Sequence, residues 1–229
     1  MAHVLAGSED SYSHLLYLFI MLSLSLSLSS GTTPPPATAF SYSNFTSTAG
    51  LQLSIAEVVS VGGRHVVALP DIALSGAGSV FTTNHVQLNG FVTSFKLNFT
   101  SLEGIPAQDG VAFVVNASPK QYAGAGAGIG YAATEPAGTT GIPLSLAVEF
   151  DIFSDADMND PLLPHISVHS LGGEPNSARE AAPAVLCAPA TALPSFFNPD
   201  GVEIRIEYSS PLAWAPPGLD SQFTAYGGN

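Results

Sequence analysis

The segment FVTSFKLNF, residues 91–99, constrains the fold of this chain more than any other stretch. Every second residue from Phe91 to Phe99 carries an apolar or β-branched side chain, with mostly polar residues between them. Successive side chains of a β-strand point to opposite faces, so this alternation predicts a strand with one buried face. Similar but less regular patterns predict further strands at residues 40–45, 51–61, 64–69, 111–115, 144–150, 165–169 and 202–208.

These strands are short, and glycine, proline and asparagine residues separate them. No segment shows the 3.6-residue period that is typical of an amphipathic helix. The chain has 229 residues, of which 46% are hydrophobic, and this is enough to fill the core of one β-sandwich. We therefore predict an all-β fold, an antiparallel β-sandwich over residues 40–208.

The first 39 residues differ in character from this domain. An apolar run from Leu15 to Leu28, in which leucine alternates with serine, is too short and too rich in serine to span a membrane. Such a run suits the apolar region of a secretory signal peptide. Residues 1–39 are therefore predicted to be a signal peptide and a Pro-rich linker, which makes the protein secreted. The alternation also suits a β-strand, and this alternative stays open.

The charge argues against two classes of partner, and the cysteine content excludes disulfide bonds within the chain. The formal net charge is −13, with 5 lysine and arginine residues in all. Nucleic acids and anionic membranes bind basic patches, so neither is predicted as a partner. Cys187 is the single cysteine, so no disulfide bond can form within the chain.

The strand at residues 144–150 leads into a cluster of carboxylates. Glu149, Asp151, Asp155, Asp157 and Asp160 follow one another without any lysine or arginine between residues 120 and 179. Carboxylates crowded in this way repel one another unless a cation neutralises them, and oxygen ligands favour hard divalent ions. His165 adds an imidazole, which Mn²⁺ accepts more readily than Ca²⁺ does. A solvated acidic loop is the alternative, because most runs of charge are exposed surfaces.

The sequence EFDIFSD, followed by Asp160-Pro161 and His165-Ile166, resembles the metal-binding segment of the legume (L-type) lectins. The likeness extends over residues 40–208 and implies a jelly roll of the concanavalin A-like kind. It further implies a Mn²⁺ site and a Ca²⁺ site that share two bridging carboxylates. The implied ligands are Glu149, Asp151, Asp160 and His165 for Mn²⁺, and Asp151, the Phe153 carbonyl, Asp155 and Asp160 for Ca²⁺.

Two further loops resemble the sugar-binding loops of this family. The segment Asp109-Gly110-Val111-Ala112-Phe113 is similar to its D-G-L-A-F motif, although Asp-Gly is also an ordinary hairpin turn. The glycine-rich segment 124–130 is similar to the loop whose backbone N–H binds the sugar. The resemblance implies carbohydrate contacts from Asp109, Gly126, Ala127, Gly128, Phe153 and Asp155. Asp155 departs from the family, which usually has asparagine there, and an aspartate cannot donate a hydrogen bond from an NH₂ group.

The C-terminal part departs from the family as well. The chain is similar to the ectodomain of plant lectin receptor kinases, but that family continues through further strands after the position of Tyr208. Residues 209–229 are instead rich in proline and glycine. We predict an irregular tail over residues 209–229 and a sandwich that lacks its last strands.

These features predict a non-catalytic lectin that needs Ca²⁺ and Mn²⁺, binds mono- or oligosaccharides and glycoprotein glycans, and forms homo-oligomers. Asn44, Asn98 and Asn116 begin N-x-S/T sequons and are candidate glycosylation sites. Two alternatives are a truncated lectin-like protein without sugar binding and a glycoside hydrolase on the same architecture. The hydrolase needs a second carboxylate as its acid/base, and Ser154 at the matching position argues against it.

Overall fold

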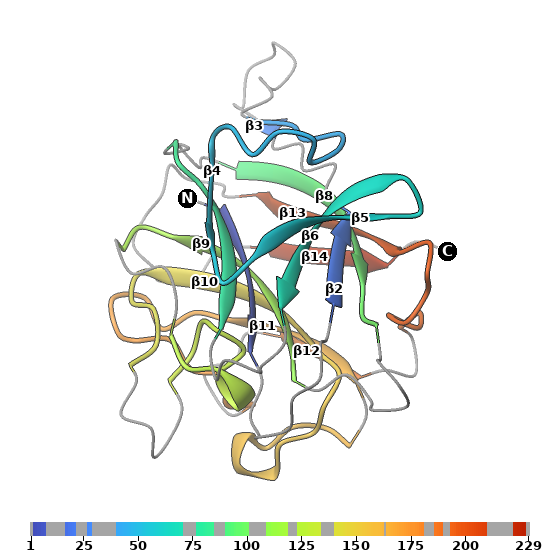
Figure 1. Ribbon diagram of the computed structural model, residues 1–229. Helices are drawn as coiled ribbons and strands as arrows, with labels where there is room; N and C mark the ends of the chain where they lie inside the picture. The colour runs from blue at the N-terminus through green and yellow to red at the C-terminus, as the bar shows by residue number, and fades with distance from the viewer. Residues whose placement is uncertain are drawn as a thin grey trace.

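The computed structural model describes residues 2–7, 17–21, 27–28, 40–70, 77–84, 90–100, 109–118, 123–133, 140–162, 164–180, 186–189, 193–209 and 222–227. Within these residues the chain forms two antiparallel β-sheets, with two short 3₁₀-helices and no α-helix (Figure 1). The prediction of an all-β antiparallel sandwich is therefore confirmed.

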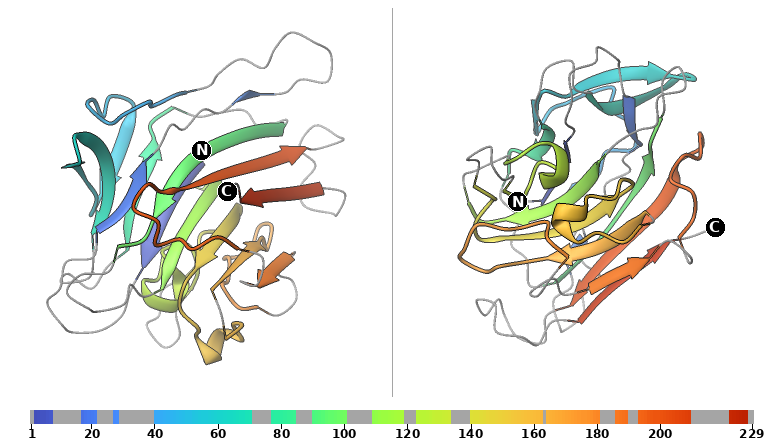
Figure 2. Two further views of the ribbon diagram at one scale, coloured as in Figure 1. Left: turned by 90° about the vertical axis from the view of Figure 1, so that its right-hand side faces the viewer. Right: turned by 90° about the horizontal axis from the view of Figure 1, so that it is seen from below.

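The two sheets, here called sheet A and sheet B, lie as separate layers (Figure 2). Sheet A has the strand order β12-β11-β10-β9-β1-β7-β4, and sheet B has the order β14-β13-β8-β2-β6-β5, with β3 also paired to β8. The strands of sheet A are β12 Leu186–Pro189, β11 His165–His169, β10 Ser145–Asp151, β9 Gly110–Asn116, β1 Ala2–Gly7, β7 Gly78–Thr82 and β4 Leu51–Ser54. Those of sheet B are β14 Gln222–Gly227, β13 Val202–Ser209, β8 Gly90–Asn98, β2 Tyr17–Met21, β6 Arg64–Pro70, β5 Glu57–Val61 and β3 Ser27–Leu28.

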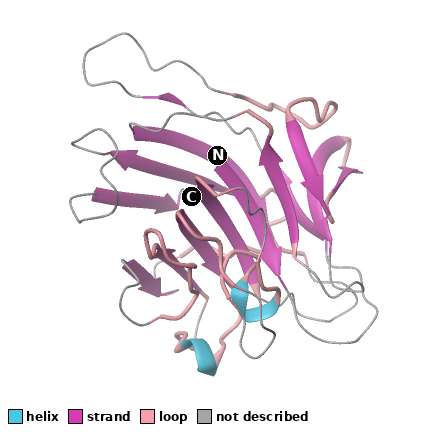
Figure 3. Ribbon diagram, turned by 90° about the vertical axis from the view of Figure 1, so that its left-hand side faces the viewer, coloured by secondary structure: helices cyan, strands magenta, loops and turns pink. Residues whose placement is uncertain are grey.

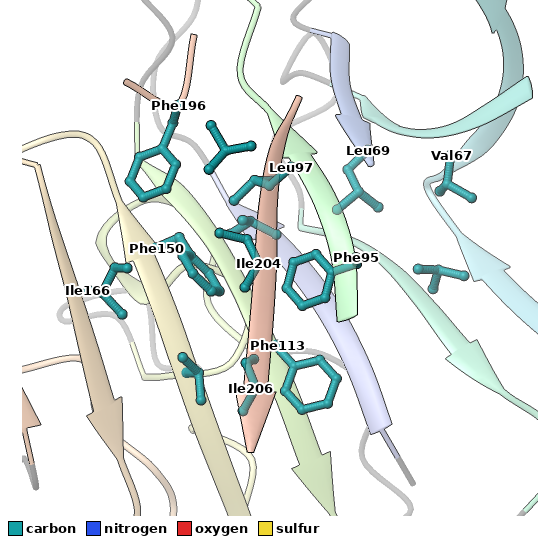
Figure 4. Packing of buried hydrophobic residues seen from close by; sticks show 14 of the residues in the cluster. Val67, Leu69, Phe95, Leu97, Phe113, Phe150, Ile166, Phe196, Ile204 and Ile206 are labelled. Carbon is teal, nitrogen blue, oxygen red and sulfur yellow. The ribbon is translucent and has the colours of Figure 1, made fainter. Parts of the chain in front are cut away.

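The strand predicted from residues 91–99 is β8, and it contributes much of the core between the sheets. Phe95 and Leu97 are at most 1% exposed, and Phe95 stands opposite Ile204 of β13. On the facing sheet, Phe113 stacks against Phe95 at a ring-centroid distance of 6.1 Å, and Phe150 meets the same ring edge-on. Figure 4 shows these apolar side chains interleaved between the two layers. The alternation of the sequence therefore predicted which residues fill the core.

Sheet A is buried on its outer face as well, where β9 and β10 pair. Val111 and Phe113 point into the main core, whereas Ala112 and Val114 pack in a second apolar cluster. That second cluster includes Ile129, Tyr131 and Ile142, which come from the segments that run over this face. Side chains on the outer face of β10 are consequently shielded from water.

The structure corrects three predictions of strand boundaries. Residues 40–45 do not form a strand: Asn44 Oδ1 instead accepts hydrogen bonds from the backbone N–H and the hydroxyl of Thr46, which favours a turn. Residues 51–61 form two strands in different sheets, because the backbone turns at Ile55 with a φ of 47°. Strand β7 was not predicted, since its five residues are all buried and show no alternation.

Both ends of the chain contain paired strands. Strand β1 lies between β7 and β9, and β2 pairs with β6 and β8. These strands lie within the region predicted as a signal peptide, and its cleavage stays a prediction. The predicted irregular tail is wrong for residues 222–227, which form β14 alongside β13. The segment QFTAYG is rich in aromatic and β-branched residues, which favour strands.

Candidate metal centre

Two neighbouring strands of sheet A present polar side chains on the outer face. Phe150 of β10 and Ile166 of β11 point into the core, so the residues on either side of them point outward. In the register of the pair, Asp151 stands opposite His165 and Glu149 opposite Ser167. Glu149 and Asp151, two residues apart on one strand, therefore lie on the same face.

Glu149, Asp151 and His165 form a compact buried group. Their exposed fractions are 1%, 4% and 0%, and one ligand atom from each lies within 4.8 Å of the others. His165 Nε2 is 3.7 Å from Glu149 Oε1, yet neither ring nitrogen of His165 has a hydrogen-bond partner. Buried polar atoms are normally satisfied, so these nitrogens point to a ligand that the protein itself does not provide.

The loop after β10 folds back over the end of the strand. The Phe153 N–H donates to Asp151 Oδ1 at 2.7 Å, and the Asp155 N–H donates to Asp160 Oδ2 at 2.7 Å. A 3₁₀-helix, η2 (Ala156–Met158), makes the turn between these contacts. Its C-cap residue, Asn159, has a φ of 60°, a conformation that asparagine tolerates better than most residues. The loop therefore brings Asp160 back toward Asp155.

The electrostatics of this group favour a bound cation. Burial raises the pKa of Glu149 to about 7 and raises the pKa of Asp151, whose ionisation Glu149 further opposes. Burial also raises the pKa values of Asp155 and Asp160. In the described part of the chain, the ion pairs of Glu149 are with histidines alone. A divalent cation would supply the missing positive charge and hold these carboxylates ionised.

The donor set fits the two ions implied by the sequence. Mn²⁺ would be held by Glu149, Asp151, Asp160 and His165, which mix carboxylates with one imidazole. Ca²⁺ would be held by oxygen atoms alone, from Asp151, Asp155, Asp160 and the Phe153 carbonyl.

The loops predicted to contact carbohydrate lie at the same end of the sandwich. Figure 3 shows η2 and the other 3₁₀-helix, η1 (Gly126–Gly128), at this end. The Asp109 carbonyl accepts a hydrogen bond from the Ile152 N–H at 2.9 Å, and Asp109 is 5% exposed. Its carboxylate is close enough to Asp151 to oppose the ionisation of that residue.

Gly110 allows these segments to approach one another. A Cβ atom at this position would lie 2.4 Å from the Phe150 carbonyl oxygen and 3.0 Å from Ile129 Cδ1. Ile129 directly follows η1, whose Gly126 and Gly128 are buried and whose Ala127 is half-buried. The Asp109 loop, the end of β10 and η1 are therefore in direct contact. Phe153 and Asp155 stand on the neighbouring loop, with the Phe153 side chain 40% exposed.

Several residues of the site were missed by sequence reasoning. The Tyr131 hydroxyl donates to Glu149 Oε2, and Ser167 Oγ lies 3.5 Å from Glu149 Oε1. His169 and Glu180 also face Glu149. His169 was predictable, since it follows His165 by four residues on a strand and so shares its face. Glu180 was not, because a hydrogen bond from its N–H to the Met158 carbonyl brings a distant segment to the site.

The three sequons differ in exposure. Asn44 is exposed, whereas Asn98 is 8% exposed and Asn116 is 5% exposed. Asn116 also belongs to β9, where it stands opposite Ser145. A glycan needs an accessible acceptor, so the geometry favours Asn44.

The fold and the site together define a class of protein, the antiparallel β-sandwiches with an acidic and histidine-containing centre beneath the loops at one end. Residues 37–210 match the family model of the legume lectin domain. The chain belongs to this family, whose members are generally non-catalytic and bind carbohydrate. A comparison with curated proteins found no match. In the part of the chain that the structure describes, no helix has the length and apolar character needed to cross a membrane.

Proposed function

We propose that this protein is a non-catalytic lectin whose carbohydrate site depends on bound Ca²⁺ and Mn²⁺. The observation that carries this proposal is the buried group of Glu149, Asp151 and His165, directly beneath the loops that bear Asp109 and Asp155. Carboxylates crowded at a buried site without a lysine or arginine partner are costly, so a sandwich that keeps them there gains stability when cations bind.

The two ions have different tasks in this scheme. Mn²⁺ would bind to Asp160 and to residues on β10 and β11, and the core already holds these two strands in place. Ca²⁺ would bind mainly to the loop that contains Phe153, Asp155 and Asp160. It would therefore order the segment that faces the sugar. When bound, the ions supply positive charge and fixed coordination geometry, and the protein's own groups make the sugar contacts.

The carbohydrate contacts are proposed for Asp109, for the backbone of Gly126, Ala127 and Gly128, and for Phe153 and Asp155. Asp109 supplies a carboxylate acceptor for sugar hydroxyls, and the exposed Phe153 ring offers an apolar surface to a sugar face. Small residues in η1 permit close approach of a ligand to the backbone.

Asp155 favours a second candidate function, a lectin-like protein that binds metal without binding sugar. Aspartate keeps an oxygen for Ca²⁺ but removes the NH₂ donor that asparagine would present. One unsatisfied hydrogen bond in a desolvated site costs about 1–3 kcal/mol, which lowers affinity by roughly one to two decades. A glycoside hydrolase is disfavoured, because Ser154 follows the Glu149–Asp151 pair where an acid/base carboxylate is needed.

A binding experiment on the purified full chain separates these candidates. A glycan array should show binding with Ca²⁺ and Mn²⁺ and none after chelation, with recovery when both ions are restored. Metal binding without glycan binding would favour the second candidate. A melting temperature that is unchanged by chelator and by both ions would refute the metal sites altogether, because ligands of the folded state raise its stability.

We further propose that the protein is secreted and carries a glycan at Asn44, and that it forms homo-oligomers. The sequon at Asn44 is exposed, and its side chain is turned toward Thr46 of the same sequon. N-terminal sequencing of protein secreted from eukaryotic cells would locate the cleavage site. Recovery of an uncleaved N-terminus would contradict the signal peptide.

A further inference from the structure

Beside the group of Glu149, Asp151 and His165 lies a second cluster of metal-ligating side chains. One ligand atom each from Glu149, His169 and Glu180 lies within 4.8 Å of the other two. His169 Nε2 is 3.3 Å from Glu180 Oε1 and 4.0 Å from Glu149 Oε2. The side chains are 3%, 5% and 1% exposed for His169, Glu180 and Glu149.

An unsatisfied atom marks this cluster as a site for a ligand. Glu180 Oε1 is buried and has no hydrogen-bond partner, although it is 3.3 Å from the Nε2 atoms of both His165 and His169. A carboxylate oxygen that faces two imidazoles without proper hydrogen-bond geometry has the arrangement expected of groups that converge on a cation.

We propose that Glu149, His169 and Glu180 form an additional transition-metal site, best suited to Zn²⁺, which we call the His169 site. Glu149 lies between the two clusters: its Oε1 is 3.7 Å from His165 Nε2, whereas its Oε2 faces His169. Glu149 would therefore bridge the His169 site and the proposed Mn²⁺ site. The proposal goes beyond the lectin function and does not require that a sugar binds.

The chemistry of the donors selects the ion. One imidazole and two carboxylates suit Zn²⁺, which binds such ligands at about 2.0–2.2 Å in tetrahedral geometry. Ligands at this distance from a tetrahedral centre lie about 3.3–3.6 Å apart. His169 Nε2 and Glu180 Oε1 already have this spacing, at 3.3 Å, whereas Glu149 Oε2, at 4.0 Å from His169 Nε2, would move inward when the ion binds. Three protein ligands leave one coordination position for water. Calcium is disfavoured, because it takes more ligands and prefers oxygen alone.

The protein positions these ligands before the ion arrives. Ser167 Oγ lies 2.7 Å from His169 Nε2 and holds the ring toward the carboxylates, and the ion would replace this contact. The Tyr131 hydroxyl hydrogen-bonds to Glu149 Oε2, which retains a second lone pair for the ion. The Asn176 side chain donates to the His169 carbonyl at 3.1 Å and anchors the segment that brings in Glu180.

The test uses the full chain, stripped of metal and then saturated with Ca²⁺ and Mn²⁺. Titration with Zn²⁺ should show one further ion per chain, with Mn²⁺ retained in its paramagnetic resonance signal. Glu180→Gln and His169→Gln should each weaken this Zn²⁺ binding by at least about tenfold. Glu174→Gln and His65→Gln are matched controls, because both residues are exposed, and they should bind Zn²⁺ as the unaltered chain does.

In the Zn²⁺ titration, any of three results would overturn the proposal: no additional Zn²⁺, release of one Mn²⁺ for each Zn²⁺ taken up, or equal Zn²⁺ affinity in all four variants. Co²⁺ gives a second readout on the unaltered chain, since a four-coordinate site produces intense visible absorption and a six-coordinate site produces weak absorption. Weak absorption alone would contradict the His169 site. Zn²⁺ binding that depends on Glu180, in a chain that binds no glycan, would support the site while refuting the lectin function.

Discussion

Without bound metal, the folded state of this protein should become less stable as the pH rises from about 5 to about 8. Burial raises the pKa of Glu149 from 4.5 to about 7, so the folded chain holds a proton that the unfolded chain has already released. The stabilisation is fully present below the unfolded pKa of 4.5, and it is lost as the pH rises through about 7.

The neighbouring groups act in the same direction. The pKa of Asp151 is raised by burial, and the pKa of His165 is raised because the carboxylates of Glu180, Glu149 and Asp160 outweigh its burial. Both groups bind a proton more tightly in the folded chain than in the unfolded chain, so their contributions to stability also fall as the pH rises. Glu180 differs, since His165, His169 and Ser167 lower its pKa against the effect of burial. Its contribution is lost only in acid, below this pH range.

The magnitude follows from the shift at Glu149 alone. A displacement from 4.5 to about 7, at 1.36 kcal/mol for each pH unit, corresponds to about 3 kcal/mol in the free energy of unfolding. Bound ions should reverse the trend, because metal ligands must be deprotonated and metal affinity therefore rises with pH. Metal-free and metal-loaded chains should diverge most at the upper end of the range.

Urea unfolding at several pH values, with chelator and with both ions, measures this directly. Glu149→Gln is the informative variant, because a neutral amide removes the proton equilibrium at that position and should reduce the slope of the metal-free curve by the part that Glu149 contributes. Glu174→Gln is the matched control for the loss of one exposed carboxylate. The reasoning is refuted if the metal-free chain keeps constant stability, or gains stability, as the pH rises through this range.

Three further predictions concern single positions. Gly110→Ala should lower the free energy of unfolding by about 1–3 kcal/mol, because the added Cβ would lie 2.4 Å from the Phe150 carbonyl oxygen. It should also weaken metal binding. Unchanged stability in urea unfolding would contradict this prediction. Asp155→Asn should strengthen hexose binding by about 1 kcal/mol in titration calorimetry at saturating Ca²⁺ and Mn²⁺, and weaker sugar binding would exclude a contact from this residue. Asn44→Gln should remove the glycan mass from protein secreted by eukaryotic cells, whereas Asn116→Gln should leave it in place.

The direction of each side chain on a regular strand was predictable, because successive side chains point to opposite faces of the sheet. The two-residue alternation that marked Phe91–Phe99 as a strand also gave the face of each side chain in β8 and β13. It failed for β7, which is buried throughout and carries no alternation. It also failed at residues 40–45, where alternation is present but side-chain hydrogen bonds of Asn44 compete with strand pairing.

The residues of the candidate site likewise include some that the sequence predicted and some that it did not. The acidic cluster pointed to Glu149 and Asp151, and the family resemblance named them with His165 as ligands; the structure adds that their strands are neighbours and their side chains share a face. Glu180 enters from a segment whose path depends on the Met158 carbonyl and on Asn176, and no local pattern encodes those contacts. Alternation within a strand thus predicts which side chains share a face, but not which ligands tertiary contacts bring from elsewhere.

The core and the site are built from the same residues of β10, and this links the position of the ligands to the hydrophobic effect. A slip of one residue in the pairing of β10 would turn Phe150 toward the site, and Glu149 and Asp151 into the core. Such a slip would forfeit about 1.5–3 kcal/mol of apolar burial at Phe150 alone, and it would place two carboxylates among apolar side chains. The register of β10 is therefore set by the core before any ion binds. It follows that the candidate ligands on β10 and β11 are preorganised by the packing of the core.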